Sequence, residues 1–99
     1  MYILKNMKEK RFNIDIVLRK TKRWDFKELL IQKNIIYFEW FVELNEDVSI
    51  ISVDVNIDEL EELYNFIFEK LSESRIVLPN GTRFQAKLPF DFIKTKLTK

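Results

Sequence analysis

Carboxylates are the first groups in this chain to consider for acid–base chemistry, because it contains sixteen Asp and Glu residues and neither His nor Cys. Two carboxyl groups flanking a bond can act as general acid and base, as in glycoside hydrolysis. Most of these carboxylates stand in charge runs, and no pair is set apart by its neighbours. The absence of His and Cys excludes Ser-His-Asp triads, thiol nucleophiles and His- or Cys-ligated zinc sites. We therefore predict that the chain is not an enzyme and that it has no cofactor and no metal site.

Two motifs for binding ions or phosphates also fail. The segment Asp54-Val55-Asn56-Ile57-Asp58 resembles the start of a calcium loop, but the sixth position is Glu59 instead of Gly and the twelfth is Asn65 instead of Glu. The chain contains a single Gly, which excludes a Gly-rich phosphate-binding loop. We interpret the segment as the end of a strand followed by a helix cap.

An acidic stripe with one aromatic residue is the first candidate binding surface. It lies on a helix expected over about 57–73, whose apolar residues follow helical spacing: Leu60, Leu63, Tyr64, Ile67 and Leu71. The opposite side of this helix carries, in steps of three and four, Glu59, Glu62, Phe66, Glu69 and Glu73. An exposed aromatic anchor among carboxylates would suit a partner protein with a basic rim around an apolar pocket. The alternative is that Phe66 packs under a loop or the terminal segment.

The segment 35–44 carries a second pattern of acidic and aromatic residues. One set of alternate residues is wholly apolar and is expected to face the core: Ile36, Phe38, Trp40, Val42 and Leu44. The other set includes four further candidate partner-binding residues: Tyr37, Glu39, Phe41 and Glu43. The alternative for this second set is a buried face under the C-terminal hairpin.

A basic turn with a neighbouring aromatic ring is the third candidate surface. Its residues are Arg19, Lys20, Lys22, Arg23 and Trp24. Cations beside an aromatic ring suit phosphates and stacked bases, so this turn is the candidate nucleic-acid site. The alternative is an ordinary solvated turn, with Trp24 in the core.

Charge is sorted along the sequence. Residues 1–33 have a net charge of +6, residues 34–73 of −10 and residues 74–99 of +5, although the whole chain sums to only +1. Such segregation bears on partners and solubility and does not determine the fold.

The elements that must position these residues are predicted from periodicity and turn chemistry. Strands are expected over 11–19, 35–44 and 48–55, and over 24–32 a strand is favoured over a short helix with Asp25 and Glu28 as its capping box. Pro79-Asn80-Gly81 predicts a hairpin between 76–78 and 82–88, and Pro89 can open a short terminal helix. The predicted fold class is α+β, an antiparallel β-meander of four to five strands with the amphipathic helix on one face and a C-terminal hairpin.

The composition favours a single domain over residues 1–99 with a substantial core, because 46% of its residues are hydrophobic. The side chains predicted to be almost wholly buried are Ile14, Ile16, Phe38, Trp40, Leu60, Leu63 and Ile67. The absence of Cys is compatible with a reducing compartment, and without an apolar run of membrane length we expect a cytoplasmic protein with no membrane partner.

The leading functional hypothesis is a small non-enzymatic protein-binding module that uses the acidic helix face to engage a basic surface on another protein. In its small size, its high charge and its frequent Lys, Ile, Phe and Asn residues, the chain resembles inhibitors, immunity proteins and accessory proteins of phages or mobile elements. One alternative is a nucleic-acid-binding protein that acts through the basic turn. A second is a homo-oligomeric structural component, whose exposed aromatic residues form the interface between copies.

Overall fold

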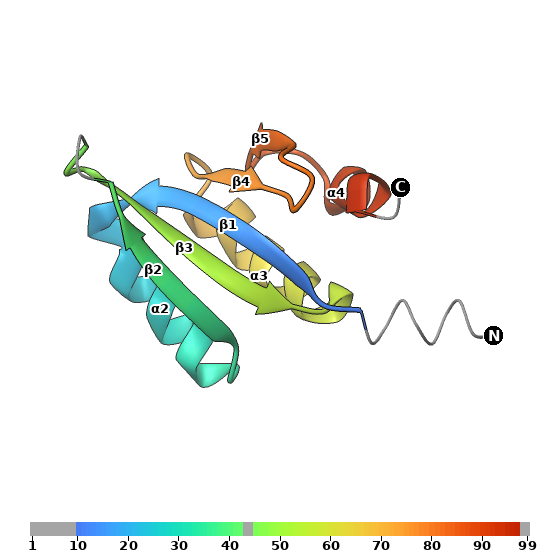
Figure 1. Ribbon diagram of the computed structural model, residues 1–99, viewed down its shortest axis with the longest axis horizontal. Coiled ribbons are helices and arrows are strands. Elements are labelled where there is room, and N and C mark those ends of the chain that lie inside the picture. The colour runs from blue at the N-terminus through green and yellow to red at the C-terminus, as the bar shows by residue number, and fades with distance from the viewer. Residues whose placement is uncertain (1–9, 43–44, 98–99) are drawn as a thin grey trace.

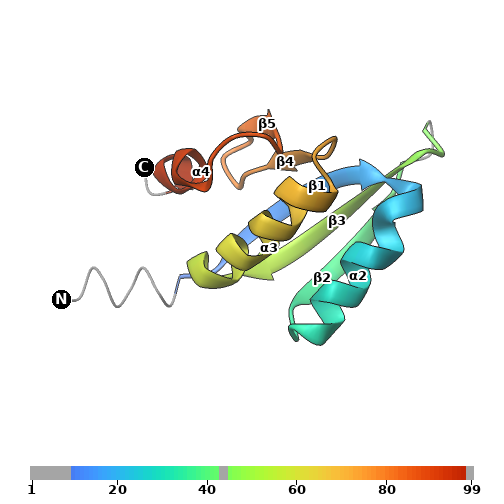
Figure 2. The ribbon, with the colours of Figure 1, turned by 180° about the vertical axis from the view of Figure 1, so that it is seen from behind.

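The chain folds into one antiparallel sheet with helices on one of its faces, as seen in a computed structural model that describes residues 10–42 and 45–97. Its elements in order are β1 (Phe12–Arg19), the 3-10 turn η1 (Lys20–Lys22), α2 (Arg23–Gln32), β2 (Ile36–Phe41), β3 (Val48–Val55), α3 (Ile57–Lys70), β4 (Arg75–Val77), β5 (Arg83–Gln85) and α4 (Phe90–Leu97). Helices α2 and α3 lie on the same face of the sheet, and the opposite face is open (Figure 1, Figure 2). The predicted α+β class with an antiparallel sheet is confirmed.

The strand order is β2-β3-β1-β4-β5, and every neighbouring pair is antiparallel. The elements β1-α2-β2-β3-α3-β4 with the order β2-β3-β1-β4 make the ferredoxin-like, or split β-α-β, arrangement, to which β5 and α4 are added. In the predicted meander, consecutive strands would lie side by side. In the structure β3, and not β2, lies beside β1, because α2 carries the chain to the border of the sheet before β2 begins. The arrangement by itself does not indicate a function.

The prediction of a strand over 24–32 is wrong, because these residues form helix α2. Phe26 and Leu30, four residues apart, are fully buried against the sheet, whereas Trp24 is exposed. The capping box of Asp25 and Glu28, which was the signal for the alternative of a short helix, is not formed: the N-cap is Lys22, which makes no side-chain cap hydrogen bond. Burial of the 26/30 pair, rather than a local start signal, accounts for this helix.

Helix α3 is confirmed, although it ends at Lys70, before the predicted boundary. Its start is a capping box in which the Asn56 side chain accepts a hydrogen bond from the Glu59 amide (2.8 Å) and Glu59 accepts one from the Asn56 amide (3.0 Å). The residues predicted to face the sheet are buried: Leu60, Leu63, Tyr64, Ile67 and Leu71.

The C-terminal hairpin and helix close the β4 side of the sheet. Gly81 adopts a positive φ of 87°, and the Leu78 amide donates to the Thr82 carbonyl (2.9 Å), as expected for a turn at Pro79-Asn80-Gly81. Tyr64 on α3 donates a hydrogen bond to the Leu88 carbonyl just before α4, and its ring contacts Phe90 of α4, with ring centroids 5.8 Å apart. Burial raises the pKa of Tyr64 above its ordinary value of 10.0.

Strand β2 presents to the core the face opposite to the one predicted. Phe38 and Trp40 are 60% and 53% exposed, so their predicted burial is wrong. The register explains this, because Tyr37 is paired with Val53 and Glu39 with Ile51, and both β3 residues point toward the helices. The other predicted core residues are at most 1% exposed: Ile14, Ile16, Leu60, Leu63 and Ile67.

Candidate functional site

The acidic stripe of α3 is largely paired with cations from elsewhere in the chain. Glu59 lies 3.1 Å from Arg11, and Glu62 accepts a hydrogen bond from Lys33 at 2.8 Å. Beyond the end of the helix, Glu73 lies 2.8 Å from Arg19. Glu69 is exposed. The charge that the sequence concentrates in this stretch is therefore partly offset by basic residues that the fold brings beside it.

Phe66 is not the exposed anchor that the sequence suggested. Its side chain is half-buried, packs against the core, and stacks on Phe26 of α2 with ring centroids 6.3 Å apart. It lines a shallow groove between α2 and α3 together with Leu29 and Leu71. The more exposed aromatic residue of this helix is Phe68, which contacts Tyr64. The Phe66 ring therefore packs against helix α2. The alternative raised from the sequence had placed it under a loop or the terminal segment instead.

The basic turn also faces acidic groups. Arg19 is paired with Glu73, and Arg23 lies 3.6 Å from Glu39. The hollow beside the turn is lined on its other side by Glu46 and Asp47. Lys22 is exposed, and the ammonium of Lys20 lies 5.5 Å from the centre of the Phe41 ring.

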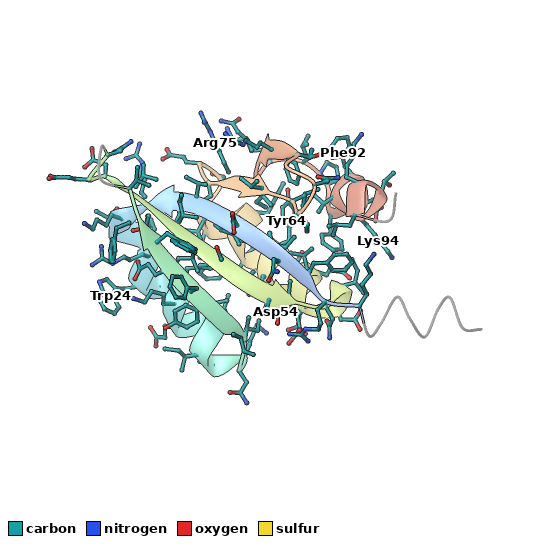
Figure 3. The ribbon with its side chains drawn as sticks, in the orientation of Figure 1. Trp24, Asp54, Tyr64, Arg75, Phe92 and Lys94 are labelled. Carbon is teal, nitrogen blue, oxygen red and sulfur yellow. The ribbon has the colours of Figure 1, made fainter. Side chains whose placement is uncertain are left out.

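Trp24 is exposed and points away from the body of the molecule in Figure 3, so the alternative that placed it in the core is wrong. The Lys27 ammonium lies 4.1 Å from the centre of its ring, and the Arg23 guanidinium lies 5.4 Å from it. These cations hold the indole in place through cation–π contacts.

The mixed set of the 35–44 segment faces α2, and not the C-terminal hairpin. Glu39 is held between the sheet and α2, where it accepts a hydrogen bond from Lys27 (2.9 Å) and lies near Arg23. Tyr37 packs against the core, and Phe41 is exposed at the end of β2. The remaining candidate, Glu43, lies outside the described residues.

Exposed apolar side chains are concentrated on α2 and β2, and only two of them, Trp24 and Phe41, were among the candidate residues. Among the described residues, eight large hydrophobic side chains are exposed, and six of them belong to α2 and β2. We call these six the α2–β2 surface: Trp24, Ile31, Ile36, Phe38, Trp40 and Phe41, each more than half exposed. Ile31 was not among the predicted site residues, and Ile36, Phe38 and Trp40 were expected in the core. Ile36, Phe38 and Trp40 alternate along the open face of β2, whereas Trp24 and Ile31 lie on α2 on the other side of the strand, so the surface wraps around the β2 edge. Exposed apolar patches, such as the contacting Phe38 and Trp40 rings, mark interaction sites.

The aromatic pair of this surface is fixed by a hydrogen-bonded chain. The Trp40 indole N–H donates to Ser52 Oγ (3.0 Å), and the Ser52 hydroxyl donates to Asp15 Oδ1 (2.6 Å). The Trp40 and Phe38 rings are 4.7 Å apart between centroids. The three strands β2, β3 and β1 each supply one member of the chain, which only the sheet register brings together. A pre-oriented aromatic pair loses little side-chain entropy on contact with a partner.

The backbone of β2 is the second component of this surface. Strand β2 is a border strand of the sheet, and among residues 10–42 and 45–97 no strand pairs with its outer edge (Figure 1). An unpaired edge presents a row of N–H and C=O groups that can accept another strand. Charged residues normally protect such edges, but the one charged residue of β2, Glu39, is turned inward to Lys27.

Comparisons of this chain with protein-family models, with curated proteins and with solved structures find no match. Among the described residues, no helix is long and apolar enough to cross a membrane.

Proposed function

We propose that this chain is a small non-enzymatic protein-binding module and that its binding site is the α2–β2 surface. The observation that carries the proposal is the coincidence of six exposed apolar side chains with an unpaired edge strand. Aromatic side chains in this number supply the buried anchors of protein interfaces, and the free edge supplies main-chain hydrogen bonds.

The geometry favours this surface over the acidic face of α3. Glu59 and Glu62 are engaged by Arg11 and Lys33, so a basic partner would have to displace those cations. Phe66, its central ring, is packed on Phe26. The α2–β2 surface needs no such rearrangement, because its side chains are already exposed.

The hydrogen bonds of the Ser52 hydroxyl give little support to a catalytic role for this residue. Its proton is directed to Asp15, and its oxygen accepts the indole N–H of Trp40. A nucleophilic serine needs a base that takes its proton and a third group that orients the base. Ser52 and Asp15 instead hold Trp40 in position, which suits a binding surface.

Nucleic-acid binding is less well supported, because the phosphate-binding cations that a basic turn would offer are partly paired. Arg19 and Arg23 both contact carboxylates, and Glu46 and Asp47 face the turn. A gel shift at low salt with duplex DNA, single-stranded DNA and RNA tests this alternative. Sub-micromolar binding that weakens steeply with salt and is lost in Lys20→Glu/Lys22→Glu would favour nucleic acid over protein as the partner.

Site-specific photo-crosslinking tests the proposal directly. A photoreactive phenylalanine analogue is placed at Phe38 in the full chain, and a matched chain carries it at Phe68 on α3, which is also exposed. After irradiation in cells of the source organism, we expect a discrete protein adduct at position 38 and none at position 68. Mass spectrometry identifies the crosslinked protein, with other copies of this chain counted as well. The same adducts at both positions, or no adduct at position 38, would contradict the proposal.

A further inference from the structure

We propose that the partner at the α2–β2 surface is a second copy of this chain, joined across a twofold axis that passes beside Phe38. This inference rests on the proposed function, because it uses the same surface. In such a dimer the β2 strands of the two copies pair in antiparallel fashion and the two sheets become one. A twofold interface must be complementary to itself, and both layers of the α2–β2 surface meet that condition.

The strand layer is complementary to itself when Phe38 lies opposite Phe38 of the other copy. In this register Ile36 faces Trp40 of the other copy, so every exposed residue on the open face of β2 acquires an apolar partner. On the other face of the strand, Tyr37 lies opposite Glu39, which keeps the two glutamates from facing each other. Aromatic and β-branched pairs directly opposite one another stabilise antiparallel strands, and like charges in that position destabilise them.

The helix layer is complementary in the same arrangement. Helix α2 lies behind β2 in Figure 1 and in front of it in Figure 2, and the Lys27–Glu39 contact places the middle of the helix near the middle of the strand. Trp24 and Ile31 are seven residues apart, which is two helical turns, so they lie on one stripe of the helix. The axis beside Phe38 makes the two α2 helices antiparallel, so that Trp24 of one copy approaches Ile31 of the other.

Charge complementarity supports the same partner. The first half of α2 carries Arg23, Asp25 and Lys27, two cations and one carboxylate, whereas the second half carries Glu28 and no cation. Antiparallel helices therefore set the basic half of one copy against the half of the other that contains Glu28. A partner with a strongly charged surface finds less to pair with here, because Arg23 and Lys27 already contact Glu39.

The proposed axis makes a charge-swap experiment possible. Phe38→Lys places two lysines directly opposite each other in the dimer, and Phe38→Glu places two glutamates there. Because Phe38 is exposed in the single chain, neither change buries a charge in the monomer. Sedimentation velocity of the purified wild type from micromolar to millimolar concentration should show a monomer–dimer equilibrium. Each variant alone should raise the dissociation constant by more than about tenfold.

An equimolar mixture of the two variants should recover the dimer, since Lys and Glu then face each other across the axis. Native mass spectrometry should find the mixed species in excess of either homodimer. Recovery requires both chains to be folded, so it also excludes unfolding as the cause of dissociation. Phe68→Lys is the matched control on α3, and it should leave the dissociation constant within about twofold of wild type, as expected for a residue outside the interface.

Three outcomes would overturn the inference: a wild type that stays monomeric over the whole range, a dimer that Phe68→Lys disrupts and Phe38→Lys does not, or a mixture that remains monomeric. The first outcome separates this inference from the proposed function. If the chain is monomeric but position 38 still crosslinks to a different protein, the α2–β2 surface remains a binding site and its partner is not a second copy. A chain that neither dimerises nor forms an adduct at position 38 loses both.

Discussion

The α3 side and the α2–β2 side of the molecule use similar residues in opposite ways. On the α3 side, aromatic and aliphatic side chains point into a core that the sheet, α2 and α4 enclose. On the α2–β2 side, apolar side chains of the same kinds point outward from both layers. The difference indicates that exposure of a residue here depends on whether a neighbouring element covers it, and not on residue type.

The two border strands of the sheet show the same contrast. Strand β5 is only three residues long, carries Arg83 and Gln85, and is followed by α4. Strand β2 has six residues, and five of them are apolar or aromatic. Short and charged edges discourage pairing with another chain, whereas long apolar edges invite it. This contrast is the physical basis for placing a partner at β2.

The largest expected effect is on the enclosed side. Leu63→Ala or Ile67→Ala removes a side chain with no measurable exposure, and each should lower the free energy of unfolding by about 2–5 kcal/mol. Chemical denaturation measures it. Losses below about 1 kcal/mol at both positions would mean that this face of α3 is not core.

Phe66 and Phe68 provide a sharper comparison within one helix. Phe66→Ala should lower the free energy of unfolding by about 1–3 kcal/mol, because the half-buried ring packs on Phe26. Phe68→Ala removes a more exposed ring and should cost about 0.5 kcal/mol or a little more. Equal losses in paired denaturation curves would remove the distinction between the two rings.

Substitution of Glu39 tests the contact between β2 and α2. Glu39→Gln leaves Lys27 and Arg23, both mostly buried, without their carboxylate, so stability at neutral pH should fall by about 1–2 kcal/mol. Glu62→Gln breaks an exposed pair with Lys33 and is the matched control, with an expected loss below about 0.5 kcal/mol. A loss at Glu39 no larger than the control's would show that the cluster does not hold α2 against β2.

Tyr64 tests how firmly the C-terminal helix closes the enclosed side. Tyr64→Phe removes the hydrogen bond to the Leu88 carbonyl and should cost about 1 kcal/mol at neutral pH. Because burial raises the pKa of Tyr64, the unfolded chain ionises first, and wild-type stability should decline as the pH rises above 10.0. The advantage of wild type over the variant should therefore shrink in alkaline denaturation series. A constant difference across that range would contradict the assignment.

The smallest expected effect on stability is on the outward side. Phe38→Ala should change the free energy of unfolding by about 0.5 kcal/mol or less, because the side chain is mostly exposed. The measurement belongs at a concentration where wild type is monomeric, since dimerisation would add its own stabilisation. A loss comparable to that of Leu63→Ala would break the comparison between the two sides.

Several elements were predictable because their signals are local. Asn56 and Glu59 form their capping box within one turn, and the spacing of Leu63 and Ile67 defines the buried side of α3 without reference to distant residues. The turn at Gly81 likewise follows from residues that tolerate its backbone conformation.

The candidate site was predictable only in part. Trp24 and Phe41 were named as candidates and are exposed, but Ile31 was not named, and Phe38 and Trp40 were placed in the core. Both alternate sets of the 35–44 segment are rich in apolar residues, so the period-two pattern cannot say which set faces inward. The same ambiguity hid helix α2, because Phe26 and Leu30 are compatible with either period.

The sequence by itself determined that an antiparallel α+β domain forms, where its amphipathic helix begins, and where its hairpin turns, because each depends on residues within a few positions of one another. Only the tertiary structure decided the orientation of β2 and the pairing of Arg11, Lys33 and Arg19 with the acidic stripe. Those outcomes depend on the register of β3 and on contacts between residues far apart in the chain. Exposure of Trp24, Ile36 and Phe38 follows from the same cause: a side chain is buried only where another element of the fold covers it.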